Sequence, residues 1–192
     1  MDFKDCYSIL SARATNTPAT NEQQPEVTVS TETRASTLEE DFTELEPLEL
    51  VRKFHDLQRE RIKTYRYFDD ELADIIKGNC PARYPLICSE VTNKFSRLSA
   101  SINAVKVAAS KRDMKDIAAC ISRIQSSEKE KLTLVAAHHL DQLKSTVLSG
   151  TEHITGEKTE QQVKYLADQI SACQVSISEA MEELQCAVCD LE

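Results

Sequence analysis

The sequence predicts an all-α protein, either an antiparallel four-helix bundle or an elongated helical coiled coil, with a disordered N-terminal tail. Two observations indicate this fold. Apolar residues recur every three or four positions in four separate stretches, a spacing that places them on one side of an α-helix. The three glycines and five prolines lie between these stretches or at their ends, where helix breakers are tolerated. We therefore expect a tail over residues 1–45 and one helical domain over residues 46–192.

The tail is rich in Ser, Thr, Pro, Gln and Glu, and it holds too few apolar residues to offset the entropy of ordering. One aromatic residue stands among acids at its end, and the segment is similar to the acidic–aromatic peptides through which repair and transcription factors bind a pleckstrin-like domain. This makes the segment a candidate partner-binding site, which comprises Phe42 with Glu39, Glu40, Asp41 and Glu44.

The same segment also fits the start of a helix. Pro47 suits the first helical position, and Leu45 and Leu50 have the spacing of a hydrophobic staple. This first helix is expected over residues 47–77, with Gly78 as its left-handed stop. Its apolar seam skips one position, which is occupied by Arg61.

One set of residues, spread over the first three helices and the joint before the last, carries a resemblance to a known family. These residues are Leu50, Val51, His55, Leu57, Gln58, Glu60, Arg61, Arg66, Tyr84, Pro85, Glu90, Val91, Thr92, Phe95, Glu128, Lys131, Leu132, Thr133, Thr155 and Gly156. With them, the first helix resembles the opening helix of the required-for-excision B-type family, which is named from a DNA-excision-repair locus and has small helical members. The resemblance continues into the second and third helices and spans about residues 50–185. It implies an all-helical fold and a link to excision repair, and it carries over no catalytic or ligand residue.

Three more helices are expected, over about residues 85–109, 113–148 and 157–191, with Asp113 as the N-cap of the second of these. Short joints make consecutive helices antiparallel neighbours. The second helix is shorter than the third and fourth, so part of their seams should project and support dimerisation or partner binding. The last helix has an unbroken seam: Val163, Leu166, Ile170, Cys173, Ile177, Ala180, Leu184, Ala187 and Leu191.

The net charge of −9 is unevenly distributed, because the bases concentrate in the first half of the domain and acids in the last helix. One interpretation is that these two regions face each other. The other is a phosphate-binding surface on the first helix, whose bases interleave with Asp56 and Glu60, so that nucleic-acid contact would be non-specific and salt-sensitive. This basic face comprises Arg52, Lys53, Arg59, Arg61, Lys63 and Arg66.

The strongest chemical motif is Cys186-x-x-Cys189, which could form half of a zinc site. No second tight cysteine pair exists and both residues lie off the seam, so exposed free thiols are expected. The adjacent His138 and His139 point about 100° apart on a helix, which predicts one near the seam and one exposed. His55 could contribute to a polar layer that fixes helix register. We expect no metal, no cofactor and no catalytic residue.

These observations predict a non-enzymatic scaffold or accessory factor linked by resemblance to nucleotide excision repair. It would bind repair or transcription factors, or itself, in the nucleus, with the cytoplasm as a further compartment. No apolar run approaches the ~18 residues of a membrane span, so no membrane partner is expected. The alternative is a cytoplasmic coiled-coil tether or assembly subunit with no role at DNA. A zinc- or thiol-dependent enzyme is a remote third option.

Overall fold

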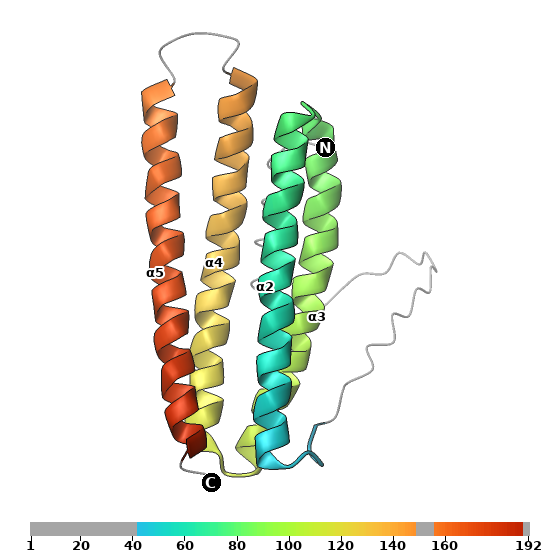
Figure 1. The fold of residues 1–192 in the computed structure, drawn as a ribbon, viewed down its shortest axis with the longest axis vertical. Coiled ribbons are helices and arrows are strands. Elements are labelled where there is room, and N and C mark those ends of the chain that lie inside the picture. Colours follow the sequence, from blue (N-terminus) through green and yellow to red (C-terminus); the bar gives the residue numbers. More distant parts are fainter. Residues whose placement is uncertain (1–41, 149–155, 190–192) are drawn as a thin grey trace, which may run out of the picture.

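The computed structural model describes residues 42–148 and 156–189, and these residues form four long helices with no strand among them. Consecutive helices run in opposite directions, up and down the long axis (Figure 1). The predicted all-α class and antiparallel order are therefore confirmed. The elements are α2 (Pro47–Lys77), the 3-10 helix η1 (Pro81–Arg83), α3 (Tyr84–Lys111), α4 (Lys115–Leu148) and α5 (Gly156–Cys189).

The helices pair as two hairpins, α2 with α3 and α4 with α5, and the hairpins meet chiefly through α3 and α4. The tops of α4 and α5 extend beyond α2 and α3 (Figure 1), as the difference in seam lengths predicted. The predicted pairing of the basic first half with the acidic last helix is wrong, because α5 lies against α4. Among the described residues, the ion pair that joins α5 to another helix is Arg123–Glu183, from α4.

The start of α2 follows the sequence closely. Pro47 occupies its first turn, and the Glu49 carboxylate accepts a hydrogen bond from the Glu46 backbone N–H at 3.4 Å. Leu45 packs on the cluster that includes Leu50, which confirms the hydrophobic staple. The turn before it is closed by the Leu45 N–H, which donates to the Phe42 carbonyl. Residues 1–41, most of the predicted tail, lie outside the described residues.

Two residues predicted to terminate or cap helices do not have those roles. Gly78 keeps a right-handed conformation at φ −81°, and the left-handed residue at the end of α2 is Asn79, at φ 48°. Helix α4 begins at Lys115, so Asp113 lies before its cap and adopts φ 62° in the turn. Asn and Asp tolerate this region because their short polar side chains bond locally. In both turns the left-handed position is therefore occupied by Asn or Asp rather than by glycine.

One end of the molecule, at the bottom of Figure 1, has a core to which all four helices contribute. We call this core the closed-end cluster. Its side chains are aliphatic apart from Phe54, Met114 and Cys120, and several are fully buried. The members are Leu50, Val51, Phe54, Ile102, Val105, Ala108, Ala109, Met114, Ile117, Ala118, Cys120, Ile121, Ile124, Ala180, Leu184 and Val188.

The other end has a core made by α2, α3 and α4, which we call the open-end cluster. It is more aromatic, and α5 contributes only the partly buried Ile170 at its edge. Its members are Tyr65, Phe68, Leu72, Ile75, Tyr84, Ile87, Cys88, Val91, Phe95, Val135, Ala136, Leu140 and Leu143.

The predicted seam of α5 is buried along the described part of its length, but unevenly. Leu166, Cys173, Ala180 and Leu184 are buried, and the other described members are half-buried. Val188, which the prediction left out, is buried too. Leu191 lies outside the described residues. The seam is therefore present in α5, and over its first half it packs against α4 alone.

Candidate functional site

A groove of about 1140 Å³ runs between α2, α4 and α5 at the open end. It lies where α5 ceases to contribute buried residues to a core shared with α2. Apolar side chains from all three helices line it, and polar side chains lie among them. The polar lining comprises Tyr65, Asp69, Lys77, Lys131, His138, His139, Gln142, Ser145, Thr146, Glu160, Ser171 and Gln174. The apolar lining comprises Leu72, Ala73, Ile76, Val135, Val163, Ala167 and Ile170.

His139 lines this groove and is 2 % exposed. Its Nε2 lies 2.9 Å from Asp69 Oδ1, and its ring packs 4.4 Å from the Phe68 ring and 6.2 Å from the Tyr84 ring, between centroids. His138 is half-buried. Burial is the main cause that lowers the pKa of its imidazole, and the neighbouring His139 lowers it further. The prediction of one histidine at the seam is confirmed, whereas the second is less exposed than expected.

The acidic–aromatic segment is only partly described, because Glu39, Glu40 and Asp41 lie outside the described residues. Phe42 is half-buried against the closed-end cluster, and Lys53 Nζ lies 5.2 Å from its ring centroid. The Thr43 carbonyl accepts a hydrogen bond from Arg112 Nη2 at 2.7 Å. Phe42 therefore has an intramolecular role, and its role as a partner-binding anchor stays a prediction.

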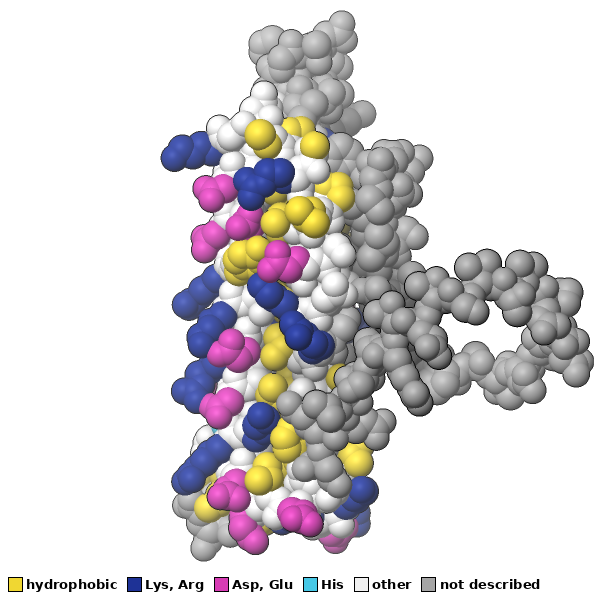
Figure 2. All heavy atoms as spheres, turned by 90° about the vertical axis from the view of Figure 1, so that its right-hand side faces the viewer, with side chains coloured by type: hydrophobic (Ala, Val, Ile, Leu, Met, Phe, Trp, Pro, Cys, Tyr) yellow, Lys and Arg dark blue, Asp and Glu magenta, His cyan; other side chains and the backbone are white. Residues whose placement is uncertain are grey.

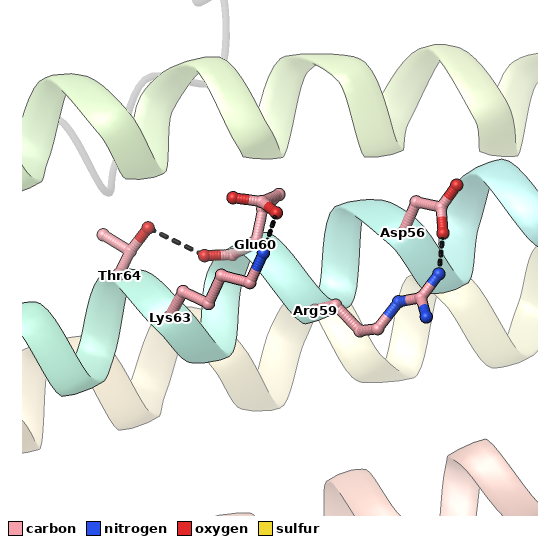
Figure 3. A network of polar contacts seen from close by, with 5 residues as sticks. All are labelled: Asp56, Arg59, Glu60, Lys63 and Thr64. Carbon is pink, nitrogen blue, oxygen red and sulfur yellow. Dashed lines mark hydrogen bonds and ion pairs between the residues drawn. The ribbon is translucent and has the colours of Figure 1, made fainter.

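The basic face on α2 is partly neutralised by its own helix. Arg59 pairs with Asp56, and Lys63 Nζ lies 2.6 Å from Glu60 Oε1, each three residues apart (Figure 3). Both pairs are exposed, so each contributes little stability. Their main effect is to reduce the positive charge that the face presents to an anionic polymer.

Arg61 does not belong to this face, which corrects the predicted set. It is 2 % exposed, and Lys53 turns toward Phe42. The remaining bases, Arg52, Arg59, Lys63 and Arg66, have spacings of seven, four and three, so they follow one line on the helix rather than spreading around it. Figure 2 shows Lys and Arg alternating with Asp and Glu along one edge of the molecule. The surface is thus mixed in charge.

A polar layer separates the two clusters, and Arg61 is its central member. Its Nη2 donates to Ser99 Oγ at 3.1 Å and to Gln125 Oε1 at 2.7 Å. Burial lowers the pKa of the Arg61 guanidinium, and the Glu128 carboxylate opposes that shift. The sequence signal for this layer was Arg61, the polar residue at the skipped position of the first seam. The predicted layer residue, His55, is half-buried beside Phe54 instead.

Cys186 and Cys189 are exposed free thiols at the end of α5, as predicted. Within residues 42–148 and 156–189, no three side chains of His, Cys, Asp or Glu gather closely enough to hold a metal ion. None of the helices among those residues is long and apolar enough to cross a membrane.

These features define a small all-helical domain, made of two antiparallel hairpins that share a core at one end and open into a groove at the other. Residues 49–142 match the model of the family DNA repair REX1-B, which confirms the resemblance found in the sequence. The matched range covers α2, α3 and most of α4, and it ends before α5.

A curated relative from Bos taurus, the required for excision 1-B domain-containing protein, is 28 % identical over 141 residues. That alignment covers 71 % of this chain and 74 % of the relative. No solved structure matches the chain.

Proposed function

We propose that the protein is a non-enzymatic helical scaffold or accessory factor of nucleotide excision repair, which acts in the nucleus by binding other proteins. Support for the repair link comes from the family, DNA repair REX1-B, and from a relative whose name includes required for excision. Support for a binding role comes from one observation, the groove between α2, α4 and α5. Exposed apolar grooves of this size on a small domain commonly bind a partner.

The groove suits an amphipathic helix of a repair protein. At the closed end, side chains from all four helices fill the space between α2 and α5. At the open end, the space between α2 and α5 is the groove. A partner helix bound there would extend the apolar packing of the closed-end cluster along the long axis. A partner helix would bury apolar residues spaced three and four apart against Ile76, Val163 and Ile170.

Proximity labelling in cells, with and without ultraviolet damage, tests this proposal. Ala73→Glu places a charge on an exposed groove residue, and Ala119→Glu makes the same change on an exposed position of α4 outside the groove. We expect the wild-type and Ala119→Glu proteins to label repair factors after damage, and Ala73→Glu to lose most of that labelling. Partners confined to the cytoskeleton or membrane trafficking would instead support a cytoplasmic tether.

The acidic–aromatic segment is proposed as a second contact, for a basic domain of a repair or transcription factor. Phe42→Ala is a poor test, because it also removes packing from the closed-end cluster. Neutralising Glu39, Glu40 and Asp41 to Gln, Gln and Asn leaves that packing in place. We expect the triple variant to keep its thermal midpoint and to bind a basic partner more weakly, with unchanged binding counting against this contact.

Non-specific contact with nucleic acid is proposed for the line of bases on α2. Arg52→Ala and Arg66→Ala should each reduce the slope of log affinity against log salt by about one charge, for any DNA sequence alike. Binding that differs between sequences, or that does not weaken with salt, would contradict this contact.

A further inference from the structure

A second concavity lies between α3 and α4, with α2 at its floor and a volume of about 570 Å³. Its size is typical of small-molecule sites. Short polar side chains line both walls, which keeps the cleft open where bulkier seam residues would have filled it. They are Ser96, Ser99 and Asn103 on α3, and Ser122, Ser126 and Thr133 on α4.

Arg61 lines the floor of this cleft with its guanidinium almost wholly buried. Its Nε and Nη1 have no hydrogen-bond partner among the described residues, and no carboxylate there lies within ion-pair distance of it. A guanidinium does not release its proton in a protein. The floor therefore carries a fixed positive charge, which the Glu128 carboxylate in the same lining offsets in part.

The hydrogen bonds from Arg61 set the polarity of the cleft wall. Arginine can only donate, so Ser99 Oγ and Gln125 Oε1 both accept from it. Gln125 Nε2 donates in turn to the Ser99 carbonyl at 3.1 Å and to Asn103 Oδ1 at 3.4 Å. The hydroxyl hydrogen of Ser99 and the amide hydrogens of Asn103 remain to donate. These hydrogens of Ser99 and Asn103 can therefore be donated to an anionic ligand.

Two charged groups complete the cleft. Lys129 is exposed beside it and adds a second positive charge. Glu128 is 7 % exposed, and its Oε2 has no hydrogen-bond partner among the described residues. A bare anion would be repelled by this carboxylate, whereas a ligand with its own donor hydrogens would satisfy it. The cleft thus offers hydrogen-bond donors at Ser99 and Asn103, positive charge at Lys129 and an acceptor at Glu128.

We propose that this cleft binds a small phosphorylated ligand that also carries hydroxyl or amino hydrogens, as a mononucleotide does. The phosphate would accept from Ser99 and Asn103 under the field of Arg61 and Lys129, and a ligand hydroxyl or amino group would donate to Glu128. This site is separate from the groove, so it does not depend on the proposed scaffold role.

Titration of the full chain with AMP, followed by amide NMR, tests the proposal, with adenosine and inorganic phosphate as separate arms. We expect saturable shifts around Ser99, Asn103 and Lys129, with a Kd below about 1 mM, and binding at least about tenfold weaker for either fragment. No saturable shift with AMP would overturn the proposal and leave a polar layer that only fixes helix register. Inorganic phosphate binding as tightly as AMP would overturn the role of Glu128 and the ligand class with it.

A variant at the donor end sharpens the test. Asn103→Asp keeps the shape of an exposed side chain but places a carboxylate where the phosphate would lie. Ser89→Asp adds the same charge at an exposed position of α3 outside the cleft. We expect Asn103→Asp to weaken AMP at least about tenfold and Ser89→Asp to leave it within about twofold. Equal affinities in the two variants would place AMP elsewhere and overturn the site.

Discussion

The closed and open ends are built from the same helices, yet α5 takes a different part in each. At the closed end it buries Ala180, Leu184 and Val188 in a core shared with the other three helices. At the open end it contributes only the edge residue Ile170, and its partner is α4 alone. Two exposed apolar residues of α5, Tyr165 and Val175, each 57 % exposed, lie before the part that enters the shared core.

A continuous heptad seam therefore does not guarantee a continuous four-helix core. On α2, the polar residues Asp69 and Lys77 line the groove beside Leu72 and Ile76, so the apolar surface that faces α5 is interrupted. A two-helix contact buries less apolar area than a four-helix core, and so contributes less stability per residue. The protein thus combines a four-helix core at one end with an open groove at the other.

The largest expected effect comes from placing a charge in each core. Leu184→Asp buries a carboxylate in the closed-end cluster and should abolish cooperative unfolding, at a cost above about 4 kcal/mol. Ile170→Asp, at the half-buried edge of the open end, should cost about 1–2 kcal/mol and leave the protein folded. Helical circular dichroism with urea unfolding measures both. Equal loss in the two variants would show that α5 is equally integrated at both ends.

Removing one aromatic side chain from each cluster is the next test. Phe54 and Phe68 are both fully buried, so each substitution by Ala should cost about 3–5 kcal/mol. Phe54→Ala should cost more than Phe68→Ala, because four helices surround Phe54 and the resulting cavity has less freedom to collapse. Urea midpoints with unchanged slopes give the two free energies of unfolding. A larger cost at Phe68 would reverse the proposed order of rigidity.

Hydrogen exchange should resolve the two parts of α5 without any substitution. Amides over residues 160–172 should exchange through local opening, and those over residues 177–188 only through global unfolding. The difference should be about 2 kcal/mol or more in opening free energy, because the first segment packs on α4 alone. Mass spectrometry of peptides from the intact chain provides the measurement. Uniform protection along α5 would contradict the comparison.

The smallest effect concerns pH. Burial lowers the pKa of His138 at the open end and of His55 at the closed end, each below the ordinary value of 6.5. The unfolded chain then binds protons more readily, so the stability they contribute is present above about pH 6.5 and is lost as the pH falls through the folded pKa. His138→Gln and His55→Gln should each reduce the loss of stability between pH 7.5 and pH 5.5, measured by urea unfolding. Unchanged pH dependence in both variants would assign the effect to other groups.

Several features of the candidate sites could be predicted from local sequence. Pro47, Leu45 and Leu50 defined the start of α2, because capping and the staple involve neighbours in the chain. The exposure of Cys186 and Cys189 followed from their position off the seam. Arg61 shows the limit: it was noticed as a break in the seam and also assigned to the surface, since periodicity alone cannot tell whether a charged residue finds partners inside.

The four helices, their approximate ends and their alternating directions could be predicted from the sequence, because apolar spacing and helix breakers act over a few residues. Only the tertiary structure decided which helices are neighbours, since complementary net charge proved a poor guide to pairing. It also decided that α5 leaves α2 at the open end and that Arg61 meets Ser99 and Gln125 across two helix interfaces. Those outcomes depend on side-chain volumes and polar contacts between residues far apart in the chain, and no local pattern encodes them.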